Sequence, residues 1–125
     1  MEDIFDDLEK WRSNRNIKVG TYDHLQLIGY LTEEITEGIR DLSEHESVDW
    51  RADCIVFLIN SLAQDGYVPR EVIRETIQEI SSRMQDPEQM RRWALHGRNG
   101  EKWQKDKNQS ESTKYKADFT KCKIT

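Results

Sequence analysis

Apolar side chains recur at helical spacing in several stretches of the 125-residue chain. The clearest stripe lies between residues 25 and 42, where apolar positions are three or four residues apart and polar residues fill the gaps. Its members are Leu25, Ile28, Leu31, Ile35, Ile39 and Leu42. Thr21 or Asp23 can cap this segment, so the pattern predicts a helix that ends near residue 42.

The next stretch is apolar on nearly every side, which is typical of a central helix. It reads A-D-C-I-V-F-L-I-N-S-L-A from Ala52 to Ala63, and Ser47 or Asp49 can start it. β-branched residues are frequent here, so a buried strand is the competing interpretation. The length of the segment without internal Gly or Pro favours a helix that ends at Gly66.

Shorter helices are predicted on either side of these two segments. Apolar residues within positions 2–12 recur at helical spacing, which predicts a short helix that packs on the rest of the domain. Pro69 fits the first turn of a fourth helix, and Asp86 can start a short fifth helix that stops at Gly97.

The apolar period fades beyond residue 97, and residues 106–125 are predicted to be disordered or ordered only against a partner subunit. The sequence therefore predicts an all-α protein. Residues 1–97 are expected to form a four-helix-type bundle with a short N-terminal helix, and residues 98–125 a basic polar tail.

Charge is unevenly distributed along the chain. The formal net charge is −5, but residues 98–125 hold eight Lys and Arg against four Asp and Glu, which is +4 and leaves −9 for the first 97 residues. An acidic body disfavours nucleic-acid binding and suits metal binding. Cys54 and Cys122 form neither a metal motif nor a disulfide framework. With no signal peptide and no apolar run of membrane-spanning length, a cytoplasmic protein without a membrane partner is expected.

Carboxylates gather on the two central segments. Glu34, Glu37 and Asp41 share one helix face, and Glu33 lies beside them. Like charges this close destabilise a helix, whereas a hard cation such as Mg²⁺ removes the repulsion. Asp53 interrupts an apolar helix, where an unpaired carboxylate is costly, so it pairs with a base, joins a hydrogen-bond network or binds a metal.

Two polar residues share the helix face of Asp53, namely Asp49 one turn before it and Asn60 two turns after it. Arg40 and Arg51 are the candidate bases for a purely structural ion pair. Because 24 of the 125 residues are acidic, an E-x-x-E pattern is expected by chance on some helix. The more specific signal is the acid inside the apolar segment.

Three motifs resemble a known family. The segments L-T-E-E-I-T-E-G-I, W-R-A-D-C-I-V-F-L-I-N and D-G-Y-V-P begin at Leu31, Trp50 and Asp65. They are similar to the MazG-like all-α nucleoside triphosphate pyrophosphohydrolases, which include dimeric dUTPases, dCTP pyrophosphatases and phosphoribosyl-ATP pyrophosphohydrolases. The resemblance covers about residues 4–85. It implies a homodimer or homotetramer that uses Mg²⁺, with Mn²⁺ as an alternative, to cleave a nucleoside triphosphate to the monophosphate and pyrophosphate.

The family pattern is E-x-x-E on one helix and E-x-x-D on the next, which together supply four metal ligands. Carried over by position, Glu34 and Glu37 match the first pair and Asp53 matches the last acid. Trp50 stands where the family has the remaining acid. This departure leaves open a degenerate relative that binds a nucleotide or a protein without turnover.

The resemblance also assigns roles to neighbouring residues. Asp49 and Glu46 are the alternatives for the missing ligand, and Glu33 is the candidate base that orients the attacking water. The candidate substrate-binding residues are Trp50, Asn60, Lys102 and Lys105, the lysines for the phosphates. A third hypothesis is a helical interaction module whose basic tail binds an anionic surface while the acids only solvate the bundle.

Overall fold

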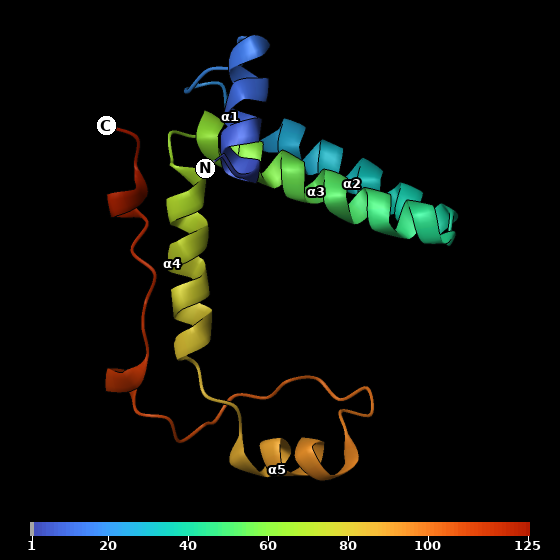
Figure 1. The fold of residues 1–125 in the computed structure, drawn as a ribbon, viewed down its shortest axis with the longest axis vertical. Coiled ribbons are helices and arrows are strands. Elements are labelled where there is room, and N and C mark those ends of the chain that lie inside the picture. Colours follow the sequence, from blue (N-terminus) through green and yellow to red (C-terminus); the bar gives the residue numbers. More distant parts are fainter. Residues whose placement is uncertain (1) are drawn as a thin grey trace. The chain divides into compact units, whose positions relative to one another are not determined.

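The computed structural model describes residues 2–125 and is all-helical (Figure 1). The helices are α1 (Ile4–Asn14), α2 (His24–Arg40), α3 (Glu44–Gln64), α4 (Pro69–Ser82) and α5 (Pro87–His96). Two short 3₁₀ turns follow at Glu111–Thr113 and Thr120–Cys122. The predicted all-α class is confirmed, and the segment from Ala52 to Ala63 is helical rather than a buried strand.

The chain divides into two compact units. The first comprises the residues up to Val72 together with Thr120–Thr125, and the second comprises Ile73–Phe119. Residues on both sides of position 97 belong to the second unit.

Side-chain caps determine where the helices of the first unit begin. Of the two predicted caps, Thr21 and Asp23, it is Asp23 that caps α2, since its carboxylate accepts a hydrogen bond from the Gln26 amide. α3 starts earlier than predicted, because Ser43 caps it and Asp41 accepts a hydrogen bond from the Ser43 amide at 2.9 Å. The connection between the two helices is therefore only three residues long, from position 41 to 43.

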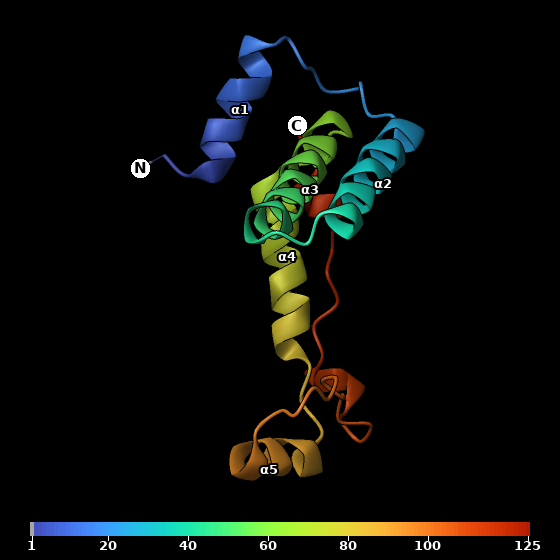
Figure 2. The same ribbon diagram turned by 90° about the vertical axis from the view of Figure 1, so that its right-hand side faces the viewer.

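α2 and α3 lie side by side and run antiparallel, as both ribbon views show (Figures 1 and 2). Tyr30 of α2 stacks on Phe57 of α3, with ring centroids 5.0 Å apart. α1 contacts α3 through a buried hydrogen bond of Arg12. These three helices form the framework of the first unit.

Most of the predicted apolar stripe of α2 does not face α3. Ile39 is 71% exposed and Leu42 is 86% exposed, and Leu25, Ile28 and Ile35 are also exposed. None of the residues described in α2 is buried. The spacing correctly identified a helix, but the stripe covers no core within this chain.

The second unit contains α5 and the loop that follows it, held together by Gln89, which is fully buried. Its side-chain nitrogen donates to the Lys102 carbonyl at 2.7 Å, and its side-chain oxygen accepts from the Gln104 amide at 2.8 Å. Glu101 accepts hydrogen bonds from Trp93 and Arg92. Buried polar side chains thus replace an apolar core here.

The expectation of a disordered or partner-docked segment over residues 106–125 differs from the structure. In the second unit, Glu75 of α4 accepts hydrogen bonds from the Tyr115 hydroxyl and the Asp118 amide, and Ser82 accepts one from the Tyr115 amide. In the first unit, the Cys122 carbonyl accepts a 2.8 Å hydrogen bond from the Val68 amide. Polar partners on α4 and its preceding loop order this segment despite its low apolar content.

Among the residues that the structure describes, no helix is both long enough and apolar enough to cross a membrane.

Candidate functional site

Glu34 is the centre of a group of carboxylates on α2 and α3. Its Oε2 atom is buried and has no hydrogen-bond partner among the described residues. Burial raises the pKa of Glu34 to about 7, followed by the negative charges of Asp53 and Glu37, a side-chain hydrogen bond with Asp53 and the charge of Asp49. The structure therefore brings together four of the predicted site residues, from two helices.

The group extends toward the turn between the helices. The pKa of Glu46 is raised by its burial and by the charges of Asp49, Glu37 and Asp41. Both residues that could replace the acid missing at Trp50 thus lie in the same band of negative charge. Glu33 is exposed on α2.

Trp50 has a packing position between the two helices. A Cβ atom built on Gly38 of α2 would lie 2.5 Å from Cδ1 and 2.6 Å from Nε1 of the Trp50 indole. Glycine at position 38 therefore allows α2 to approach this ring closely. Trp50, a predicted substrate-binding residue, does not line the aromatic cavity described next.

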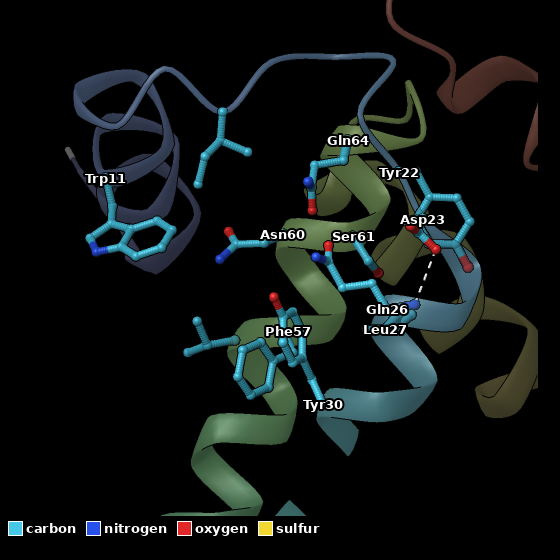
Figure 3. A pocket seen from close by; sticks show the side chains of 12 residues that line it. Trp11, Tyr22, Asp23, Gln26, Leu27, Tyr30, Phe57, Asn60, Ser61 and Gln64 are labelled. Carbon is cyan, nitrogen blue, oxygen red and sulfur yellow. Dashed lines mark hydrogen bonds between the residues drawn. The ribbon is translucent and has the colours of Figure 1, made fainter. Parts of the chain in front are cut away.

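A cavity of about 420 Å³ opens between α1, α2 and α3 (Figure 3). Tyr30 and Phe57 form one aromatic part of its lining, and Trp11 of α1 forms another. Polar side chains lie among the rings: Tyr22, Asp23, Gln26, Asn60, Ser61 and Gln64. A cavity of this size with an apolar lining and a few polar groups is typical of small-ligand sites, which run from about 300 to 1,000 Å³.

The carboxylates and the cavity are neighbours along the same helix pair. Tyr30 precedes Glu34 by one turn on α2, and Phe57 follows Asp53 by one turn on α3. Because the helices are antiparallel, both steps lead toward the same end of the pair, a displacement of about 6 Å along the helix axes.

Asn60, a predicted substrate-binding residue, lines the cavity and is bonded to a buried arginine. The Nη1 atom of Arg12 donates a 2.8 Å hydrogen bond to Oδ1 of Asn60, and each residue is only 8% exposed. Burial lowers the pKa of Arg12, and the charge of Glu9 opposes this shift. Sequence reasoning missed Arg12, although its spacing from Phe5 and Leu8 places it on the docking face of α1.

Lys102 and Lys105, the remaining predicted substrate-binding residues, belong to the second unit. Lys105 forms an isolated bridge with Gln85 and lines a cavity of that unit together with Trp103 and Tyr115. The carboxylate group and the aromatic cavity are complete within the first unit.

A divalent cation fits the chemistry of the carboxylate group. The donors are hard oxygens, and one of them, Glu34 Oε2, is buried without a partner. Within residues 2–125, no three of the His, Cys, Asp and Glu side chains converge as a preformed metal site. Cation binding would therefore require side-chain rotation in the carboxylate group.

Comparisons of the chain with protein-family models, with curated proteins and with solved structures gave no match.

Proposed function

We propose that this protein is a metal-dependent nucleotide pyrophosphohydrolase that cleaves a nucleoside triphosphate to the monophosphate and pyrophosphate. The observation that supports it most is the buried, unpaired Glu34 oxygen among three further carboxylates, one helical turn from an aromatic cavity. The motif resemblance to the MazG-like family supports the same reaction.

The carboxylate group is suited to a hard cation. Gathering four acids costs free energy through mutual repulsion and desolvation, and a bound cation offsets both. Glu34, Glu37, Asp53 and Asp49 would hold Mg²⁺ or Mn²⁺, which would neutralise phosphate charge and acidify a bound water. Glu33 is exposed beside them and is available to orient that water.

The aromatic cavity is suited to the nucleoside part of the same molecule. Tyr30, Phe57 and Trp11 offer flat surfaces to a base. A nucleotide with its base in the cavity would extend its phosphates along the helix pair toward Glu34. The two parts of the site therefore match the two ends of one ligand.

The test is a panel of deoxy- and ribonucleoside triphosphates incubated with purified protein and Mg²⁺ or Mn²⁺, with the products identified. Pyrophosphate and monophosphate are expected from at least one of them. Glu34→Gln should abolish this release, whereas Glu71→Gln, the same change at an exposed position of α4, should retain it. Absence of release from every nucleotide at high protein concentration would overturn the proposal.

The second candidate is a degenerate relative that binds without turnover, and the packing of Trp50 against Gly38 favours it because no carboxylate occupies that position. Trp50→Glu should then create or strongly raise activity, while Trp50→Gln, which removes the same ring, should not. If both variants have the same activity, the acid missing at position 50 does not explain the lack of turnover.

We also propose that a second copy of the chain covers the exposed apolar face of α2 and completes a four-helix arrangement. Ile35 and Ile39 are exposed on a helix whose main packing partner is α3, and most soluble oligomers are symmetric dimers or tetramers. Ile39→Asp should reduce the molar mass measured by light scattering. Met90→Lys, at an exposed apolar position of α5, is the matched control and should leave it unchanged. A monomeric wild-type protein would overturn this proposal.

A further inference from the structure

Asn60 places its side-chain amide in the wall of the aromatic cavity, where nine-tenths of the residue is buried. Its Oδ1 atom accepts a hydrogen bond from Nη1 of Arg12. A guanidinium has donors and no acceptor, so this bond forms only with the amide oxygen turned toward Arg12. The chemistry of Arg12 therefore fixes the orientation of the Asn60 amide.

The amide nitrogen of Asn60 is not the atom bonded to Arg12, and it faces the cavity between Trp11 and Phe57 (Figure 3). No described residue accepts a hydrogen bond from Asn60 Nδ2. Asn60 Nδ2 is not among the buried side-chain atoms that lack a partner, so it is open to the cavity that Asn60 lines. An acceptor on a ligand bound in the cavity can therefore reach this donor.

Arg12 also determines how strongly Asn60 donates. The guanidinium is buried, and it forms no ion pair with a described residue. A positive charge bonded to the amide oxygen polarises the amide, which makes its N–H groups better donors. The same charge disfavours ligand groups that direct their own N–H hydrogens at this position.

We propose that the cavity selects nucleobases by an exocyclic carbonyl oxygen that accepts a hydrogen bond from Asn60 Nδ2. Uracil and thymine carry such a carbonyl at ring position 4, and hypoxanthine and guanine at ring position 6. Cytosine and adenine carry an amino group at these positions, which cannot accept this bond. Tyr30, Phe57 and Trp11 supply the ring contacts, which are common to all bases. This inference deepens the proposed function, on which it rests for the identity of the ligand as a nucleotide.

Two comparisons between nucleosides separate the effect of the carbonyl group from the effect of ring size, because both members of each comparison have the same ring system. Uridine is compared with cytidine, and inosine with adenosine, by calorimetric titration of the full chain in the presence of a chelator. Nucleosides carry no phosphate, so their binding requires neither metal nor hydrolysis. The carbonyl member of each pair should bind at least about tenfold more tightly, which corresponds to about 1.4 kcal/mol.

Asn60→Asp provides the decisive variant, because it replaces the donor by an acceptor of nearly the same shape. Arg12 still has an oxygen to bond, and thermal unfolding checks that the variant is folded. The preference should reverse toward cytidine and adenosine. Asn16→Asp makes the same chemical change at an exposed position outside this cavity and should leave the order unchanged.

Equal affinities within both pairs, a preference for the amino member, or no binding of any nucleoside would overturn the inference. Retention of the uridine preference in Asn60→Asp would overturn the role of Asn60. A carbonyl preference in a protein that releases no pyrophosphate would overturn only the proposed reaction. Hydrolysis without any base preference would overturn only this inference.

Discussion

At the residue scale, Glu34 combines a buried oxygen with a raised pKa. Its buried oxygen lacks a protein partner, and three other carboxylates repel its charge. Each of these effects favours the protonated form, so the carboxyl group retains its proton in a pH range where an ordinary glutamate is ionised. A cation that neutralises the group would reverse this preference.

The stability of the metal-free protein should therefore depend on pH through Glu34. The pKa of Glu34 is raised from 4.5 to about 7, so between these values the folded chain binds a proton that the unfolded chain releases. The free energy of unfolding should fall as the pH rises through this window. In Glu34→Gln, unfolding temperatures measured at pH 5 and pH 8 with a chelator should differ less than in the wild type.

Stabilisation of the protein by Mg²⁺ is an independent test of the ionisation of Glu34. Because the cation binds the ionised carboxylate, it should raise the unfolding temperature of the wild type more at pH 8 than at pH 5. The gain should be lost in Glu34→Gln. Parallel pH profiles of the variant and the wild type would contradict the assignment of this titration to Glu34.

At the element scale, one glycine allows α2 to approach α3 closely at Trp50. Gly38 lies against the Trp50 ring, at a separation that leaves no space for a Cβ atom. Gly29 lies on the same helix, but a Cβ atom there would have no other atom within 4 Å. Each glycine destabilises the helix locally to a similar extent, but only Gly38 has a tertiary packing role.

Substitution by alanine should separate these roles. Gly38→Ala should destabilise the protein by about 1–3 kcal/mol, because the helices or the indole must move. Gly29→Ala should stabilise it by about 0.5–1 kcal/mol, because alanine restricts the unfolded chain and favours helix. Chemical denaturation of both variants measures the difference, and similar shifts in the two would show that Gly38 has no packing role.

At the scale of the whole molecule, the C-terminal residues return to the first unit. The Ile124 amide donates to the Gly66 carbonyl, the Val68 amide donates to the Cys122 carbonyl, and Cys122 is 1% exposed. These contacts join residues more than fifty positions apart in sequence. They make the chain end part of the first unit.

Deletion of Thr120–Thr125 should consequently destabilise the protein. Two backbone hydrogen bonds contribute about 0.5–1.5 kcal/mol each, and the burial of Cys122 adds to them. Thermal unfolding should report a loss of about 1–3 kcal/mol in the first unit. The matched control replaces the exposed Thr125 alone and should have no effect. An unchanged unfolding temperature after the deletion would favour the disordered segment that composition predicts.

Local signals predicted the helices well because caps and apolar spacing act over a few residues. Asp23, Pro69 and Gly97 lie at helix ends as predicted. The predicted start of α3 was wrong by a few residues. The hydrogen bonds of Asp41 and Ser43 close the turn earlier than the apolar pattern indicates. The ordered C-terminal segment was missed because its partners lie on α4, some forty residues away in sequence.

The sequence by itself determined the all-α class and the positions of Glu34, Glu37 and Asp53 on adjacent helices, because helical periodicity is a local property. Only the tertiary structure decided which faces of the helices meet. It turned the apolar stripe of α2 outward and directed Glu34 into the contact with α3. It also bonded Arg12 of α1 to Asn60 of α3, because a hydrogen bond between residues 48 positions apart depends on how the helices pack.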